Sequence, residues 1–382
     1  MRARGAPRLT DGLGVRGSRL DPSRLAGVAA RVLRCRLAAS IGPLSLVALG
    51  FGALLAPSCA SSPGPATPPG GVEPPTRPPD RFDALVYRRP DGTPRVERAV
   101  RLPELGLEPA PRVRYVARGP EDGAPVLLLH GLGSHLGFWA EQIEPLAAAG
   151  FRVVAIDMLG FGKSDKPAAF AYDTPSMVEV VLGVMASLEL DRAAVVGHSM
   201  GGQVGLRMAI DYPGRVSRLV LLAPAGLEPF SEAERAALLP LVTEAGVTGL
   251  SPEAIRTQTQ LNFARWRPEL EWLIEDRIAM RDFSDLPDYA RAQVMSFRGL
   301  LDTEPTRAGA ARLGVPTLVV YGGEDRLIPN RALHPQMSFE TLVADLVENP
   351  RAQVERVEGC GHLIQLDCPS ATNALMLGFL RR

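Results

Sequence analysis

The sequence predicts an α/β fold: a mostly parallel central sheet with helices on both faces and an inserted helical cap. Three observations support this prediction. From about residue 110, short continuous apolar runs alternate with segments of helical periodicity, as in a parallel sheet buried on both faces. One apolar run leads directly into the glycine-rich segment VVGHSMGGQ, residues 195–203. The stretch 227–310 then interrupts the alternation with helical patterns that include no clear strand.

The elements can be placed in chain order from near Arg81, where the folded part begins. RVRYVARG is typical of an edge strand, whereas PVLLLHG has the continuous apolar character of a buried strand. Pro175 fits the first turn of a helix that starts at residue 174. We expect strands at 112–119, 125–131, 152–157, 193–198, 218–224, 316–322 and 353–358, and helices at 137–150, 174–190, 200–213 and 370–380. The core would then cover 81–226 and 311–382, with the cap over 227–310 between its two parts.

The first 58 residues predict export. They hold nine arginines and two aspartates, and the segment that follows Arg36 is apolar and uncharged, as in a secretion signal. Its end, APSC, resembles a bacterial lipoprotein signal in which Cys59 is lipidated, with alanine where leucine is usual. An uncleaved anchor or an ordinary signal peptide is the alternative. We expect an exported bacterial protein, anchored as a lipoprotein facing the periplasm or exterior, with the proline-rich stretch 59–80 as a spacer.

Composition and charge limit the partners of the folded part. The chain has 382 residues, 46% hydrophobic and 22% charged, which is ordinary for a globular protein. Its net charge is zero, and because the first 58 residues carry +7 (nine arginines and two aspartates), the remainder carries −7 without a basic patch. Nucleic acid is therefore not expected as a partner.

Cys360 and Cys368 lie eight residues apart, which permits a disulfide, with two free thiols as the alternative.

The segment GHSMG at 197–201 fits the pattern G-x-S-x-G between a strand and a helix. In that pattern the serine sits on a sharp strand-to-helix turn, and the residues two positions away on either side must be small. Ser199 is therefore the candidate nucleophile.

Other residues with useful chemistry follow other strands of the same sheet. Asp325 comes after the strand at 316–322, and His362 comes just after the last strand. The chain order serine, aspartate, histidine is one in which catalytic triads occur. Leu132 ends an early strand, where a second oxyanion donor is needed, and carboxyl ends of parallel strands meet at one edge. Glu324 and Glu228 remain alternatives for the acid.

From about Asp83 to the C-terminus, the chain resembles an α/β-hydrolase-fold serine hydrolase with a helical cap. The segments that carry the resemblance are HGLGS, DMLGFGKSD, GHSMGG, GGEDRLIP and GCGH, and SMGGQVGLRMAIDYP and LAPAGLEPF are similar to esterase and monoacylglycerol-lipase-like members. The resemblance implies a triad of Ser199, Asp325 and His362, and an oxyanion hole formed by the backbone N–H groups of Leu132 and Met200. It implies no metal and no organic cofactor.

The implied activity is hydrolysis of a small-molecule carboxylic ester through an acyl-enzyme, and the amphipathic pattern of the cap favours a lipophilic acyl group. An amidase, a lactonase, a carbon–carbon bond hydrolase or a non-catalytic binding protein could use the same fold.

Glycines at 131, 133 and 137 followed by Asp157 weakly match a dinucleotide fingerprint, whereas GFGKS lacks the first glycine of a phosphate-binding loop. Of the remaining candidates, His130 is expected to shape the oxyanion turn, His198 to pack at the elbow, His135 to lie in a loop or line the pocket, Trp139 to lie in the core, and His334 has no assigned role.

Overall fold

The computed structural model describes residues 82–89 and 92–382. The expected signal at 1–58, the spacer at 59–80 and the lipidation site at Cys59 lie outside the described residues. Within the described part, no helix is both long and apolar enough to span a membrane.

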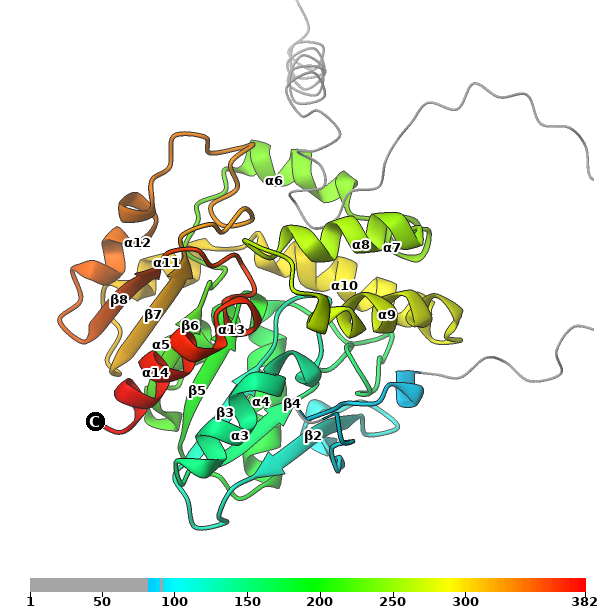
Figure 1. Cartoon of the computed structure of the whole chain (residues 1–382), viewed down its shortest axis with the longest axis horizontal. Helices are drawn as coiled ribbons and strands as arrows, with labels where there is room; N and C mark the ends of the chain where they lie inside the picture. The colour runs from blue at the N-terminus through cyan, green and yellow to red at the C-terminus, as the bar shows by residue number, and fades with distance from the viewer. Residues whose placement is uncertain (1–81, 90–91) are drawn as a thin grey trace, which may run out of the picture. The chain divides into compact units, whose positions relative to one another are not determined.

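Eight strands form one sheet, in which the six strands from β3 to β8 run parallel (Figure 1). In sheet order they are β1 (Arg98–Arg101), β2 (Arg112–Arg118), β4 (Arg152–Ile156), β3 (Pro125–Leu129), β5 (Ala193–His198), β6 (Val216–Leu222), β7 (Thr317–Gly322) and β8 (Ala352–Val357). The expectation that residues 112–119 form an edge strand is wrong, because β1 pairs antiparallel with the outer side of β2. β1 has the sequence RAVR and is largely exposed, so it carries no apolar signal. The predicted mostly parallel sheet is confirmed.

Helices cover both faces of the sheet, as expected. In Figure 1, α3 and α14 lie together in front of the strands, while α5 packs against β5, β6, α4 and α11. The helices are α3 (Ala140–Ala148), α4 (Thr174–Ser187), α5 (Met200–Asp211), α6 (Glu232–Leu238), α7 (Glu244–Thr248), α8 (Pro252–Leu261), α9 (Trp272–Ala279), α10 (Leu286–Leu300), α11 (Glu304–Ala310), α12 (Phe339–Val347), α13 (Ile364–Asp367) and α14 (Pro369–Leu380).

The segment between β6 and β7 folds into helices α6 to α11 with no named strand, in agreement with its sequence pattern. Several of these helices begin with side-chain caps. Ser231 and Glu234 form a reciprocal capping box at the start of α6, and Ser251 caps α8 by accepting from the Ala254 N–H. Helices α6 to α10 lie over the carboxyl ends of the strands (Figure 1), whereas α11 packs against α5 and α12 of the core. In the folded protein, α10 is therefore the last helix of the cap, and α11 belongs to the core.

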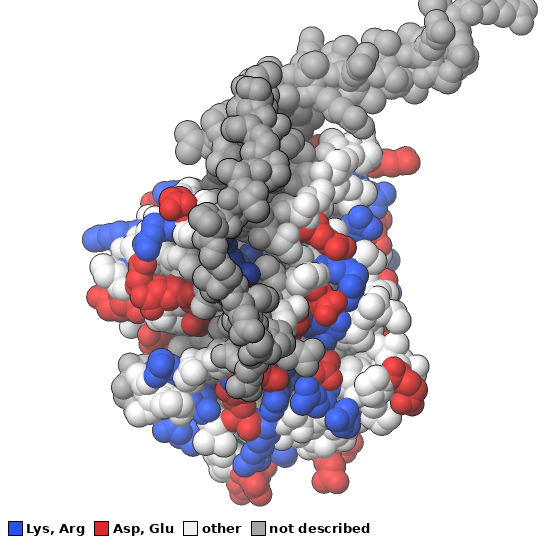
Figure 2. All heavy atoms as spheres, turned by 90° about the vertical axis from the view of Figure 1, so that its right-hand side faces the viewer, with Lys and Arg blue, Asp and Glu red and all other residues white. Residues whose placement is uncertain are grey.

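On the face seen in Figure 2, basic and acidic side chains are interspersed outside the grey region. Several of them form ion pairs, such as Arg112 with Asp165 and Arg256 with Glu271. Neighbouring opposite charges cancel each other's long-range field, which limits attraction for polyanions.

The junction of β5 and α5 is crowded against the backbone of β3. A Cβ atom on Gly201 would lie far inside van der Waals contact of the Leu129 carbonyl oxygen, and one on Gly197 would overlap the Gly201 carbonyl oxygen. These two residues are the outer positions of the G-x-S-x-G pattern. The elbow therefore needs glycine on both sides because α5 begins immediately against the sheet.

We predict that Gly201→Ala lowers the free energy of unfolding by about 3 kcal/mol, because the new methyl group meets backbone atoms that cannot move aside. Gly378→Ala in α14 is the matched control, since its Cβ would enter open space. The control should gain about 0.5–1 kcal/mol from helix propensity. Urea unfolding of both variants checks this, and a neutral Gly201→Ala variant would contradict the crowding argument.

Candidate active site

Ser199 occupies the turn between β5 and α5 with φ 51° and ψ −114°, a conformation that non-glycine residues rarely adopt. The surrounding backbone holds it there: the Ser199 N–H donates to the Leu222 carbonyl at 3.0 Å, and the Ala225 N–H donates to the Ser199 carbonyl at 3.0 Å. A strained serine held in this way at the end of a central strand is the arrangement of a nucleophile elbow.

His362 and Asp325 form a buried pair. Nδ1 of His362 donates to Oδ2 of Asp325 at 2.8 Å, and the two side chains are only 5% and 2% exposed. Oδ1 of Asp325 accepts from the backbone N–H groups of Leu327 and Ile328 at 2.8 and 3.0 Å, so the carboxylate cannot rotate freely. Because Nδ1 is the donor, Nε2 of a neutral His362 is the basic nitrogen.

The alternative acids are placed elsewhere. Glu228 accepts from Nδ1 of His334 at 2.5 Å and from the Asn330 N–H at 2.8 Å, and Glu324 is exposed. Nε2 of His334 lies 3.1 Å from Oε1 of Glu234, so this imidazole joins the core to cap helix α6. The hydrogen bond with Glu228 raises the pKa of His334, and burial raises the pKa of Glu228. Sequence reasoning missed this link because His334 lies 106 positions from Glu228 and 100 from Glu234.

The loop after β3 lies directly beside the nucleophile. A Cβ on Gly131 would stand 2.8 Å from Nδ1 of His198 and 3.2 Å from Cβ of Ser199, so the loop approaches as closely as its glycine allows. His130 lies behind it, where its Nε2 accepts from the Met158 N–H at 2.9 Å. Burial lowers the pKa of His130 to about 4, so this ring is neutral and structural. Leu132, the expected oxyanion donor, follows in the same loop.

Two cap residues hold the next carbonyl of this loop. Nη1 of Arg277 and Oη of Tyr289 donate to the Gly133 carbonyl oxygen at 2.8 and 3.1 Å. These bonds fix the peptide unit between Gly133, which has φ 70°, and Ser134, and so anchor the loop that carries Leu132 to the cap. The sequence carries no signal for these contacts.

His198 supports the loop that carries His362. Its Nε2 donates to the carbonyl oxygen of His362 at 3.0 Å, and the two ring centroids are 4.9 Å apart. Burial lowers the pKa of His198 well below the usual value. His198 is therefore a neutral positioning residue at the elbow, as expected from its place beside Ser199.

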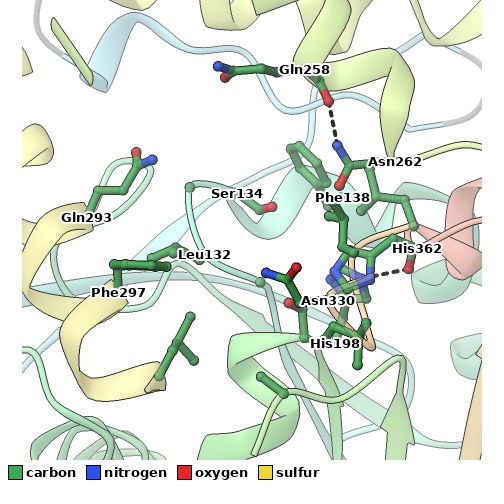
Figure 3. Close-up of a pocket in the computed structure, with 18 of the residues that line it drawn as sticks. Leu132, Ser134, Phe138, His198, Gln258, Asn262, Gln293, Phe297, Asn330 and His362 are labelled. Atoms are coloured by element: carbon green, nitrogen blue, oxygen red, sulfur yellow. Dashed lines mark hydrogen bonds between the residues drawn. The ribbon is translucent and has the colours of Figure 1, made fainter. Parts of the chain in front are cut away.

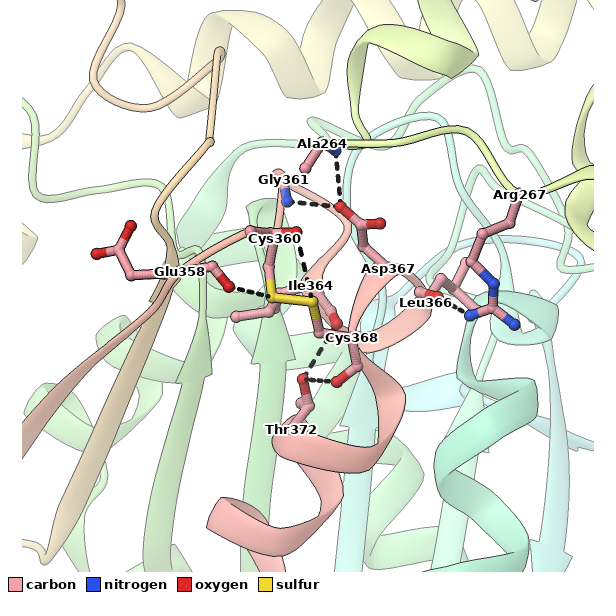
Figure 4. The surroundings of a disulfide bond; sticks show 11 residues. Ala264, Arg267, Glu358, Cys360, Gly361, Ile364, Leu366, Asp367, Cys368 and Thr372 are labelled. Atoms are coloured by element: carbon pink, nitrogen blue, oxygen red, sulfur yellow. Dashed lines mark hydrogen bonds between the residues drawn. A yellow bond between two sulfur atoms is a disulfide. The ribbon is translucent and has the colours of Figure 1, made fainter.

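The loop that carries His362 is fixed on several sides (Figure 4). Cys360 and Cys368 form a disulfide across it, which decides between the two alternatives left open by the sequence. Oδ2 of Asp367 accepts from the N–H groups of Gly361 and Ala264 at 2.6 and 2.7 Å, so one carboxylate joins this loop to the cap.

The other residues that the sequence analysis considered, His135, Trp139 and Asp157, are buried inside the fold. His135 accepts from the Gly137 N–H and stacks on Tyr87, and burial lowers its pKa to about 3. Trp139 lies fully buried in the core. Asp157 is buried and accepts from Tyr87 and from the Leu136 and Lys163 N–H groups, and burial raises its pKa to about 6. The carboxylate of Asp157 is therefore engaged in hydrogen bonds within the fold and is not placed to bind a ribose.

These elements surround one cavity of about 210 Å³ (Figure 3). Ser199, His362 and Leu132 line it, together with Glu228 and Arg277. Its apolar wall comes from both core and cap: Phe138, Phe230, Leu238, Ile255, Phe297, Leu300, Leu301, Leu327, Ile328 and Leu363. Among the residues that the structure describes, no group of three His, Cys, Asp or Glu side chains is placed to hold a metal ion.

Comparison with known proteins identifies the relatives of this fold. Residues 124–243 match the family described as alpha/beta hydrolase fold. A 2-hydroxymuconate semialdehyde hydrolase from Pseudomonas sp. strain CF600 is 32% identical over 295 residues, covering 73% of this chain and 94% of the relative. A solved probable hydrolytic enzyme from Pseudomonas aeruginosa PAO1 has a TM-score of 0.68 at 26% identity, covering 80% of this chain and 99% of the other. A solved membrane phospholipase A, described as a bacterial virulence factor, has a TM-score of 0.59 at 25% identity, covering 75% and 86%.

Proposed function

The chain belongs to the alpha/beta hydrolase fold family, and on this premise we propose that it is a serine hydrolase that cleaves lipophilic carboxylic esters through an acyl-enzyme. The observation that carries the proposal is that Ser199, His362 and the Leu132 loop line one largely apolar cavity. The two charged lining residues already have partners within the protein, since Glu228 pairs with His334 and Arg277 donates to the Gly133 carbonyl. Such a cavity favours a neutral substrate with apolar carbon chains.

The proposed reaction proceeds in two similar halves. Nε2 of His362 takes the proton of the Ser199 hydroxyl as Oγ bonds to the ester carbonyl carbon. Asp325 holds the ring and stabilises the imidazolium, while the N–H groups of Leu132 and Met200 stabilise the oxyanion, an effect of about 3 kcal/mol per donor. The C–O bond to the alcohol then breaks, and the alcohol leaves with the proton from His362. Water attacks the acyl-enzyme by the same route and releases the acid.

The relationship to a 2-hydroxymuconate semialdehyde hydrolase supports a second candidate, hydrolysis of a carbon–carbon bond on the same triad. The similarity to a membrane phospholipase A instead supports a lipophilic ester. A screen with both p-nitrophenyl esters and 2-hydroxymuconate semialdehyde separates the two candidates. Turnover of the first requires cleavage of an ester C–O bond, and turnover of the second requires cleavage of a carbon–carbon bond.

The triad assignment predicts that Ser199→Ala abolishes covalent labelling by a fluorophosphonate probe, because the probe needs the activated hydroxyl. Asp325→Asn should lower kcat about 10⁴-fold by favouring the wrong tautomer of His362. Glu228→Gln is the matched control and should lose far less, because its partner is His334. Labelling that persists in Ser199→Ala, or a larger loss in Glu228→Gln than in Asp325→Asn, would contradict the assignment.

The apolar cavity predicts a dependence on acyl length. Each buried methylene adds about 0.8 kcal/mol, close to fourfold in kcat/KM, so activity on p-nitrophenyl esters should rise from acetyl towards butyryl or octanoyl and then fall. Leu300→Phe narrows the cavity from α10 and should move the optimum to shorter chains. Val347→Phe, on the exposed side of α12, should leave the profile unchanged. A flat profile, or a preference for acetyl, would rule out the lipophilic pocket.

We also propose that the protein is exported and lipidated at Cys59. The disulfide between Cys360 and Cys368 supports this proposal, because structural disulfides persist mainly outside the reducing cytoplasm. Mass spectrometry of the protein from membranes should find an N-terminal cysteine that carries two or three acyl chains. An intact Met1 terminus on protein in the cytoplasmic fraction would refute the proposal.

A further inference from the structure

Three polar side chains of the cap gather over the oxyanion loop at Gly133. A Cβ atom placed on Gly133 would stand 3.0 Å from Nη1 of Arg277, 3.3 Å from Oη of Tyr289 and 3.5 Å from Oε1 of Gln293. Arg277 comes from α9, and the other two come from α10. A polar corner, formed by Arg277, Tyr289 and Gln293, therefore stands beside the loop that carries Leu132, at a cavity whose wall is largely but not wholly apolar.

Two members of the polar corner already have hydrogen-bond partners, whereas the amide oxygen of the third has none within the described residues. Arg277 and Tyr289 both donate to the Gly133 carbonyl. Gln293 is only 2% exposed, lines the catalytic cavity, and its Oε1 is buried without a hydrogen-bond partner in the described part of the chain. In Figure 3 the Gln293 side chain extends from α10 on the same side of the view as Leu132, and Ser134 also lines the cavity.

A buried amide oxygen without a donor is unfavourable, so its retention in a substrate cavity indicates a group that the substrate supplies. The polar corner restricts the chemistry of that group. A substrate carboxylate has no hydrogen to donate to Oε1, and an ammonium group would be repelled by the guanidinium of Arg277. A hydroxyl group is neutral and can donate to Oε1, so it satisfies the Gln293 amide as the structure places it.

We propose that Gln293 is a specificity-determining residue that selects esters carrying a hydroxyl group, with the hydroxyl in the polar corner and the carbon chain along the apolar wall. This inference rests on the proposed ester hydrolysis and narrows its substrate class. Selection by such a group is strong because a substrate without the hydroxyl leaves the buried amide unpaired when it displaces water.

The test compares matched esters that differ only in one hydroxyl. Ethyl octanoate is set against 2-hydroxyethyl octanoate, with the hydroxyl on the alcohol side, and against ethyl 8-hydroxyoctanoate, with the hydroxyl on the acid side. Acid release is followed by pH-stat titration of the full chain. We expect kcat/KM of at least one hydroxylated ester to exceed that of ethyl octanoate by about tenfold or more.

Variants then assign the preference to Gln293. Gln293→Met keeps the length of the side chain without its polar atoms and should bring the ratio close to one, whereas Gln293→Glu keeps an acceptor oxygen and should retain part of it. Gln353→Met on β8, remote from the cavity, should keep the full ratio. Circular dichroism and unfolding midpoints confirm that each variant is folded.

The outcomes separate this inference from the activity on which it rests. If none of the esters is cleaved, the proposed function fails. If esters are cleaved but the wild-type ratios are near one, or if a high ratio survives in Gln293→Met, ester hydrolysis stands and the role of Gln293 is overturned. Wild-type ratios near one would mean that water, rather than a substrate hydroxyl, satisfies the amide. A high ratio that survives in Gln293→Met would mean that another residue binds the hydroxyl.

Discussion

The left-handed backbone of Ser199 is the constraint on which the rest of the site depends. A residue with φ 51° is held only if the chain on both sides is fixed, and here β5 runs through the middle of the sheet while α5 packs against it. Gly201 allows α5 to start against the carbonyl of Leu129. The same contact brings the loop after β3 beside Ser199. The candidate nucleophile and the expected oxyanion loop are therefore positioned by one packing arrangement rather than by two.

The cap contacts both loops that the chemistry requires. It holds the oxyanion loop through the Gly133 carbonyl, and it holds the His362 loop through Asp367 and through the Leu363 N–H, which donates to the Asn262 carbonyl at 3.0 Å. A Cβ on Gly361 would lie 2.6 Å from that same carbonyl oxygen, so the cap backbone lies directly on this loop. Cap residues thus determine more than the shape of the substrate cavity, because movement of the cap would also change the alignment of the catalytic groups.

The sequence pattern predicted the features that neighbouring residues determine. It did not predict the contacts between segments that are far apart in the chain. Ser199 was identifiable because the elbow demands small neighbours at fixed spacing, and the parallel strands because their burial requires continuous apolar runs. The strand β1 was missed because its four residues, RAVR, are too few and too exposed to show a pattern and form a strand by pairing with β2. The contacts of Arg277 and Tyr289 with Gly133 could not be found, since an arginine and a tyrosine in amphipathic helices have no spacing relation to a loop about 150 residues earlier.

The ionisation of the buried histidines sets the electrostatics around Ser199. Burial lowers the pKa of His130, His135 and His198, so these rings are neutral at physiological pH. Neutral rings can orient the catalytic loops by hydrogen bonding without adding positive charge near His362, where it would oppose formation of the imidazolium. His334 differs because Glu228 raises its pKa, and it lies in a separate ion pair at the cap. The Asp325 carboxylate contacts His362 directly, as the proposed reaction requires for a histidine that gains and returns a proton in each half.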